Sequence, residues 1–343
     1  MILPESKFFE SNDFLVTDGN VLKNLTIAYQ TWGELNSKKD NAILICHGYT
    51  NHHFALDKNI GWFNNFMGPG KSLDTDKYFV ICSNMLGSSF GTSGPKSINN
   101  ITNQPYGASF PKINNIDIIN VQKLLVDYLN IDKLHAVLGY SFGGHLVYLW
   151  ATEFSDKIKG IISIAGSLER WDVTKEKIEL IEKPFSDCLN WNNGNYYALD
   201  DTEIKKALVN YRIQVLNHYG FGDYLKSENK DLKAVESVII KLAKGWANHF
   251  DPNSLIILRR ANYNSSALKK AKNIKVPILK ILASSDKVTN MKRGYKTIEY
   301  FKSLNINCRF LELKTPFGHY GPMCDSDEWS EELKNFIEGT ILK

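Results

Sequence analysis

The sequence predicts an α/β protein whose mostly parallel sheet is covered by helices on both faces, and three observations support this prediction. Six apolar runs rich in valine, isoleucine and leucine end in glycine or polar residues. Helical patterns, with apolar residues repeated at intervals of three and four, lie between these runs. One long stretch after residue 167 lacks such a run and interrupts the alternation. Strands that alternate with helices are typical of a parallel sheet with helices on both faces.

The six apolar runs are continuous rather than alternating, which favours strands buried on both faces. They span residues 41–50, 77–87, 133–141, 159–167, 276–286 and 308–319. Before them, Asp18-Gly19 between alternating apolar residues predicts a pair of strands around a turn within residues 14–35. Helices are predicted over residues 116–131, 143–158, 291–306 and 328–342.

Residues 168–270 are predicted to be mostly helical, with the best patterns over 202–220 and 231–250. A helical insertion at this point would form a lid over the carboxyl ends of the strands, where ligands bind in open α/β sheets. We therefore expect a core made of residues 1–167 and 271–343, with residues 168–270 inserted as a helical lid.

Composition bounds the class of protein. With 43% hydrophobic and 23% charged residues, a chain of 343 residues can bury a proper core. A net charge of +4 from scattered lysines does not indicate a nucleic-acid partner. No apolar run reaches ~18 residues, so we expect no membrane span, and the N-terminus lacks the pattern of a secretory signal. No C-x-x-C pair occurs among the five cysteines, which favours a reducing compartment, so we expect a cytoplasmic protein.

A serine between glycines, Gly139-Tyr140-Ser141-Phe142-Gly143, stands where a predicted strand turns into a predicted helix. A nucleophilic serine on such a turn adopts a strained backbone conformation, so its neighbours two positions away need to be almost free of side chains. The following helix would direct backbone N–H groups at the reacting centre. The alternative is a glycine-rich turn without chemistry, but the strand–turn–helix context favours the nucleophile.

A serine hydroxyl needs a base, and this arrangement predicts the order serine, acid, histidine along the chain. His319 follows the last predicted strand on a glycine-flanked loop, and Asp286 ends the strand before it. An acid at that position can fix the imidazole tautomer. Asp325 and Asp327 are rivals in the wrong order, and a strand-end aspartate can also serve as a turn or helix cap.

The loop after the 41–47 strand, "HGYTNHH", should provide a second backbone donor for an oxyanion. We expect the N–H groups of Tyr49 and Phe142 to form this oxyanion hole. The cluster His47, His52 and His53 matches no standard zinc spacing, so no metal site is predicted.

Several longer segments carry a resemblance: "LTIAYQTWGELN", "GPGKSLDTDKYFVICSN", "GYSFGG", "HFDPNSLIILRRA" and "PFGH". In these segments the chain resembles the homoserine O-acetyltransferase family of α/β-hydrolase folds. The resemblance implies transfer of an acyl group, usually from acetyl-CoA, to the hydroxyl of homoserine in methionine biosynthesis. It implies a ping-pong mechanism through an acyl-serine, no permanently bound cofactor, and a homodimer formed through lid helices.

The resemblance also implies residue roles. Ser141, Asp286 and His319 fall on the family's catalytic positions, and Tyr49 and Phe142 fall on its oxyanion positions. Arg212 and Tyr219 match positions that contact substrate; Arg212 could grip a carboxylate or could simply be a helix-surface residue. The chain departs from the family at the corner, where "GYSFGG" replaces G-G-S-M-G-G. It also departs at Tyr320, where the transferases carry an aspartate that holds the substrate amine.

The sequence therefore leaves three candidate functions. The first is an acyltransferase that acts on small molecules, and the second is an ester hydrolase with the same three residues. The third is a non-catalytic relative that serves as a binding module, which the complete set of catalytic residue types disfavours. CoA phosphates would need lysine or arginine near the mouth of the site.

Overall fold

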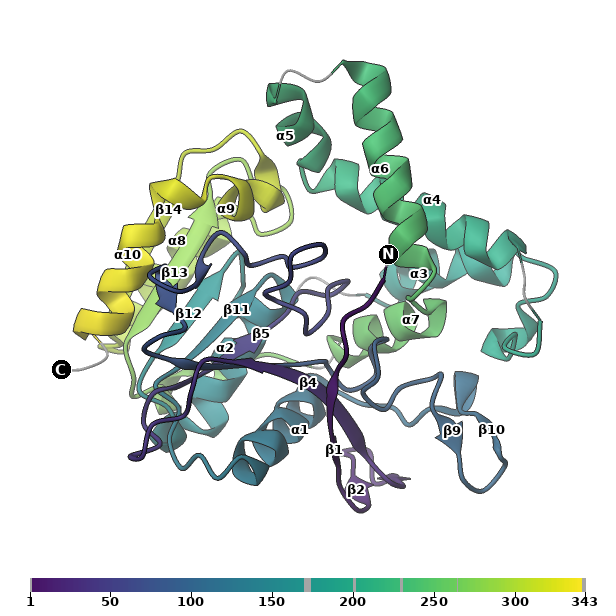
Figure 1. Cartoon of the computed structure of the whole chain (residues 1–343), viewed down its shortest axis with the longest axis horizontal. Helices are drawn as coiled ribbons and strands as arrows, with labels where there is room; N and C mark the ends of the chain where they lie inside the picture. Colours follow the sequence, from purple (N-terminus) through teal and green to yellow (C-terminus); the bar gives the residue numbers. More distant parts are fainter. Residues whose placement is uncertain (1, 170–173, 200–201, 229–230, 264, 341–343) are drawn as a thin grey trace.

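The computed structural model describes residues 2–169, 174–199, 202–228, 231–263 and 265–340. Its centre is an eight-stranded sheet in the order β1-β4-β8-β5-β11-β12-β13-β14 (Figure 1). All six predicted strands are present and run parallel. They are β5 (Ala42–Cys46), β8 (Phe79–Ser83), β11 (Ala136–Tyr140), β12 (Ile161–Ile164), β13 (Ile278–Ala283) and β14 (Cys308–Leu313). The predicted α/β class with a mostly parallel sheet is confirmed.

The N-terminal strands differ from the prediction. Asp18-Gly19 does form the turn of a hairpin, but its strands β2 (Phe14–Leu15) and β3 (Val21–Leu22) are short. The strand β4 (Thr26–Trp32) instead joins the main sheet antiparallel to β8, and β1 (Lys7–Glu10) pairs antiparallel with β4. At the other edge, β14 is only partly buried, because an edge strand has one neighbour and less cover.

Two apolar layers cover the sheet. One face packs against α1 (Asn115–Tyr128), α2 (Phe142–Glu153) and α8 (Met291–Ser303). The other packs against α10 (Ser330–Asn335) and the π-helical turn that follows it. Strand β5 shows the alternation, since Leu44 belongs to the first layer and Ile43 and Ile45 to the second. The helices predicted over 116–131, 143–158 and 291–306 are confirmed. The helix predicted over 328–342 is split into short helical pieces up to residue 340, and residues 341–342 lie outside the described residues.

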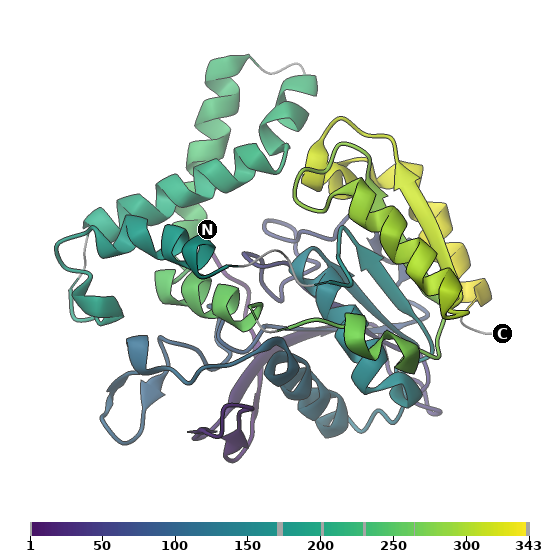
Figure 2. The ribbon, with the colours of Figure 1, turned by 180° about the vertical axis from the view of Figure 1, so that it is seen from behind.

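Helices α3 to α7 lie between β12 and β13 in the chain. They are α3 (Lys175–Ser186), α4 (Thr202–His218), α5 (Phe221–Ser227), α6 (Leu232–Ala247) and α7 (Pro252–Ala261). We call them the α3–α7 segment. In both views α4, α5 and α6 project away from the sheet (Figures 1 and 2), whereas α7 joins the main apolar cluster through Leu255 and Leu258. The segment's own apolar cluster contains Leu225, Val235 and Ile239. The division of the chain into core and lid at residues 167/168 and 270/271 stays a prediction.

The main chain of Asp251 links this segment to the core, because its backbone N–H donates to Ser89 Oγ at 3.0 Å. The buried carboxylate of Asp251 caps α7 and accepts a hydrogen bond from Tyr197 Oη at 2.8 Å, within the same inserted stretch. None of the helices in the described ranges is long and apolar enough to cross a membrane.

Candidate active site

Ser141 occupies the turn between β11 and α2, with φ 58° and ψ −112°. A positive φ is strained for a residue with a side chain, and the surrounding glycines explain how the turn fits. A Cβ on Gly143 would lie 1.9 Å from the carbonyl oxygen of Cys46, and one on Gly139 would lie 2.1 Å from the carbonyl oxygen of Gly143. The G-x-S-x-G pattern therefore follows from close backbone packing around this buried turn.

Three side chains meet at this corner in a hydrogen-bonded chain. His319 Nε2 lies 2.7 Å from Ser141 Oγ, and His319 Nδ1 lies 2.7 Å from Asp286 Oδ2. A carboxylate only accepts, so Nδ1–H donates to Asp286 and leaves Nε2 to accept the serine proton. All three residues are buried. The structure thus brings together the three residues that were selected from chain order, and this geometry suits a serine nucleophile.

The loops that carry the acid and the base are fixed by further hydrogen bonds. Asp286 Oδ1 accepts from the backbone N–H groups of Val288 at 2.7 Å and Thr289 at 3.0 Å. Tyr140, beside the nucleophile, donates from its hydroxyl to the carbonyl of His319 at 2.8 Å. His319 is therefore held at its ring by Asp286 and at its main-chain carbonyl by Tyr140, the last residue of the strand before the serine.

Ser141 opens into a cavity of about 420 Å³. The cavity wall includes Tyr49, Arg212, Tyr219 and Tyr320, so the remaining predicted substrate and oxyanion residues lie at the same site, apart from Phe142. Phe142 is the first residue of α2, directly after the nucleophile, and its ring stacks on Tyr49 with centroids 6.1 Å apart. The first N–H groups of a helix have no partner within the helix, which suits the donor role expected of Phe142.

The α3–α7 segment holds the loop that contains Tyr49. Tyr49 Oη donates to the carbonyl of Leu255 in α7. Trp246 Nε1 of α6 donates to the carbonyl of Thr50 at 2.9 Å, and Arg212 Nη1 of α4 donates to Thr50 Oγ1 at 2.6 Å. The position of the expected oxyanion donor therefore depends on three helices that lie far away in the sequence.

The three histidines of this loop have separate surroundings. His47 Nε2 accepts from the N–H of Met85 at 3.0 Å and its Nδ1–H donates to the carbonyl of Gly48 at 2.8 Å, so the ring is neutral. Burial lowers the pKa of His47 to about 4 and that of His52 to about 3. His53 pairs with Ser6 Oγ at 2.8 Å, and burial lowers its pKa to about 2. In the described part of the chain, no group of three or more His, Cys, Asp or Glu residues could hold a metal ion.

Arg212 lies among aromatic side chains that line the cavity. Its guanidinium lies over the Trp246 ring, 5.1 Å from the centroid. Tyr219 meets the His319 ring edge-on, with centroids 4.7 Å apart, and its carbonyl accepts the N–H of Tyr320 at 2.8 Å. Burial raises the pKa of Tyr219 to about 12, so its phenol is neutral near pH 7. Burial lowers the pKa of Arg212, but an arginine starts from so high a pKa that the guanidinium stays charged near pH 7.

Comparison with known proteins places the chain. The alpha/beta hydrolase fold family matches residues 41–322. The homoserine O-acetyltransferase of Pasteurella multocida is 34% identical over 97% of this chain and 98% of its own length. That of Methanohalobium evestigatum is 33% identical over 98% of this chain and 74% of its own length. The chain belongs to the homoserine O-acetyltransferase family. The resemblance and the α/β-hydrolase fold expected from the sequence are confirmed.

Solved structures agree on the fold of this homoserine O-acetyltransferase family member. Esterase E22 superimposes with a TM-score of 0.85 at 26% identity, covering 97% of this chain and 100% of that one. The homoserine O-acetyltransferase of Bacillus anthracis superimposes with a TM-score of 0.83 at 24% identity, with 99% of each chain covered. The same architecture therefore serves proteins described as transferases and as esterases.

Sequence reasoning missed Trp246, Thr50 and His52 as cavity residues of this family member. His52 is considered in the sequence analysis only as a metal ligand, and Thr50 lies in the same loop without a role of its own. Trp246 lies three residues before the segment "HFDPNSLIILRRA", which is the nearest sequence signal.

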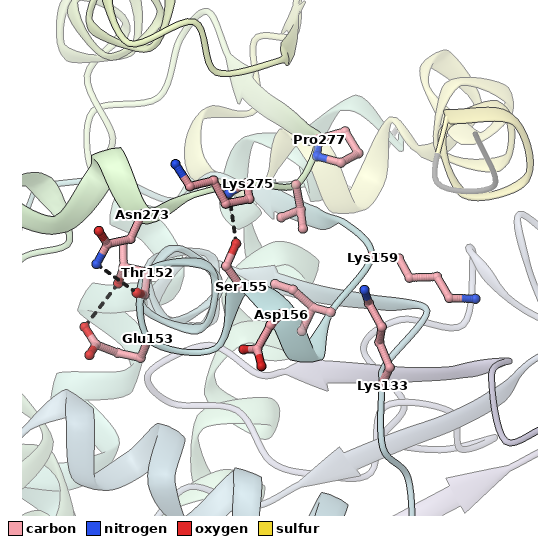
Figure 3. A pocket seen from close by; sticks show the side chains of 11 residues that line it. Lys133, Thr152, Glu153, Ser155, Asp156, Lys159, Asn273, Lys275 and Pro277 are labelled. Atoms are coloured by element: carbon pink, nitrogen blue, oxygen red, sulfur yellow. Dashed lines mark hydrogen bonds between the residues drawn. The ribbon is translucent and has the colours of Figure 1, made fainter.

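A second hollow lies at the opposite edge of the sheet, where β11, β12 and β13 begin (Figure 3). Lys133, Lys159 and Lys275 line it beside Glu153 and Asp156. The residues that line it include no histidine or cysteine. The chemistry is therefore expected at the carboxyl edge, around Ser141.

Proposed function

We propose that the protein is a serine-nucleophile O-acyltransferase that moves an acyl group, with acetyl as the expected one, from CoA to a small alcohol. The observation that carries the proposal is the hydrogen-bonded chain from Ser141 through His319 to Asp286, at 2.7 Å for each link, open to a cavity. Membership of the homoserine O-acetyltransferase family supports transfer and makes acetyl-CoA the expected donor.

The mechanism has two halves. His319 Nε2 takes the proton of Ser141 Oγ as the oxygen attacks the thioester carbonyl, and backbone N–H groups of Tyr49 and Phe142 stabilise the oxyanion. The carbon–sulfur bond breaks, and His319 returns the proton to the leaving CoA thiolate. An alcohol then attacks the acyl-Ser141 ester, again with His319 as base, and the carbon–Oγ bond breaks. Asp286 keeps the imidazole in the required tautomer throughout.

Substrate positioning falls to the cavity wall. Arg212 offers a guanidinium for a carboxylate on the alcohol, and Tyr219 and Tyr320 border the route to Ser141. Because the α3–α7 segment supplies two of these three residues, it both shapes the site and limits the entry of water, which would otherwise hydrolyse the acyl-enzyme.

A carboxylic-ester hydrolase is the second candidate, and the overlap with esterase E22 favours it. In that reaction the donor is an ester, so the first half breaks a carbon–oxygen bond and His319 gives its proton to the leaving alcohol. In the second half water replaces the acceptor alcohol and releases the acid, while Ser141, His319 and Asp286 keep the same roles.

Mass spectrometry after mixing with acetyl-CoA tests the proposal. We expect one acetyl group on the wild-type chain, located at Ser141 by peptide mapping, and none on Ser141→Ala. The variant should keep its fold and lose turnover by about a thousandfold or more. An active Ser141→Ala variant would refute the nucleophile. Absence of the adduct together with rapid cleavage of p-nitrophenyl esters would favour the hydrolase.

Two broader expectations belong to the same proposal. Homodimerisation through helices of the α3–α7 segment and a cytoplasmic location follow from the family resemblance and from the composition. Light scattering of the purified chain tests the first, and fractionation of cells tests the second.

A further inference from the structure

The cavity around Ser141 is lined by a positive charge and by no negative charge among the described residues. Among the described residues that line it, Arg212 is the one formally charged side chain, and none is an aspartate or glutamate. The rest of the lining consists of aromatic, aliphatic, amide and hydroxyl side chains, glycine backbone and His52. His52 is neutral at pH 7, because burial lowers its pKa to about 3.

Arg212 makes two contacts at the cavity, and neither is with a carboxylate. Its Nη1 donates to Thr50 Oγ1 at 2.6 Å, and its guanidinium lies 5.1 Å from the centroid of the Trp246 ring. None of the described residues that line the cavity is an aspartate or glutamate that could pair with this guanidinium. A guanidinium that is shielded from bulk water and has no carboxylate partner favours the binding of a ligand that contains a carboxylate.

We propose that the acyl acceptor is a short hydroxy acid that carries a carboxylate and no ammonium group. The inference rests on the proposed function and names the substrate class of that same site. The carboxylate binds Arg212, the carbon chain lies against Tyr219 and Tyr320, and the hydroxyl reaches the acyl-Ser141 ester. In the transfer, the acyl carbon bonds to this hydroxyl, its bond to Ser141 Oγ breaks, and His319 moves the proton from the hydroxyl to Oγ.

An ammonium group on the acceptor would lose its hydration without gaining an acid partner, and Arg212 would repel it. Aromatic faces offer the remaining attraction for a cation, but several are already in contact. Arg212 occupies the Trp246 ring, Tyr219 packs on His319, and Tyr320 packs edge-on with Phe221 at 5.0 Å. The cavity thus selects for an anion over a zwitterion.

The test uses two acceptors that differ by the amine alone, 4-hydroxybutanoate and L-homoserine. The wild-type chain is first acetylated with acetyl-CoA, or with p-nitrophenyl acetate, and the Ser141 adduct is measured by mass before any acceptor is added. If neither donor acetylates Ser141, the proposed function fails. If the adduct forms, we expect kcat/KM for O-acetylation of 4-hydroxybutanoate to exceed that of L-homoserine by about tenfold or more. Equal rates, a preference for L-homoserine, or no transfer to either acceptor overturns the inference.

A pair of variants isolates the charge. Tyr320→Asp places a carboxylate on the cavity wall, and Tyr320→Asn provides the same size without the charge. Relative to Tyr320→Asn, the aspartate variant should shift the acceptor ratio about tenfold towards L-homoserine, with the rate of Ser141 acetylation as an internal control. Arg212→Gln should weaken both acceptors. An unchanged ratio in Tyr320→Asp shows that the missing acid does not set the preference and overturns the proposal.

Discussion

The turn around Ser141 and the α3–α7 segment both depend on a glycine pressed against a carbonyl oxygen. A Cβ on Gly143 would lie 1.9 Å from the Cys46 oxygen, and one on Gly220 would lie 2.3 Å from the Phe317 oxygen. Gly143 is the second residue of α2 and packs against the end of β5, and both elements are buried in the core. Gly220 lies between α4 and α5 and faces a loop. The core holds the catalytic side chains in place, whereas the α3–α7 segment shapes the cavity through which a substrate reaches them.

Gly143→Ala should have the largest effect, because neither neighbour of the added methyl group can move. We expect the free energy of unfolding to fall by about 4 kcal/mol or more, measured by urea denaturation. Gly339→Ala is the control, since Gly339 is exposed and its added Cβ meets nothing within 4 Å. That control should change stability by less than about 0.5 kcal/mol. A well-folded Gly143→Ala protein would contradict the rigid turn.

A second comparison concerns two cations that have no carboxylate partner, Arg212 in the cavity and Lys280 in the core. Lys280 Nζ donates to the carbonyl of Gly166 at 2.8 Å, and burial lowers its pKa from 10.5 to about 8. Between pH 8 and pH 10.5 the unfolded chain still holds a proton at this lysine that the folded chain has released. The free energy of unfolding should therefore rise with pH in that window, by up to roughly 3 kcal/mol.

Lys280→Met removes this titration, so the stability difference between wild type and variant should move in favour of the wild type from pH 7 to pH 10.5. Urea denaturation at a series of pH values measures it. Parallel curves for the two proteins would show that the lysine is solvated in the folded chain.

Gly220→Ala should have the smallest effect on stability, about 1–2 kcal/mol, because the α3–α7 segment and the loop at Phe317 can both give way. Activity should fall more, by about tenfold in kcat/KM, since the neighbouring Tyr219 carbonyl holds the N–H of Tyr320. Gly70→Ala is the matched control: Gly70 has φ 71°, yet a Cβ there meets nothing within 4 Å. Equal losses of activity in both variants would mean that backbone strain, and not displacement of the segment, causes the effect.

The core and Ser141 could be predicted because their signals are local, and Asp286 and His319 because they end late strands in the expected order. Gly139 and Gly143 frame the serine within five residues, and the buried strands are continuous apolar runs. The contact of Trp246 with Thr50 joins residues 196 positions apart, and no local sequence pattern predicts it. Arg212 and Tyr219 were found only through the family resemblance, because on periodicity alone they are ordinary residues of an amphipathic helix. Strand β1 was missed because four residues with two adjacent phenylalanines give no readable alternation.

The hydrogen bond from Tyr140 to the main chain of His319 joins an early part of the chain to a late one. The nucleophile and its base are 178 residues apart, and β13 and β14 are the last strands to emerge during translation. A nascent chain that has completed β12 therefore carries a serine with no imidazole beside it. The hydrogen-bonded chain at Ser141 is therefore complete only after β13 and β14 have joined the sheet, because Asp286 and His319 follow these two strands.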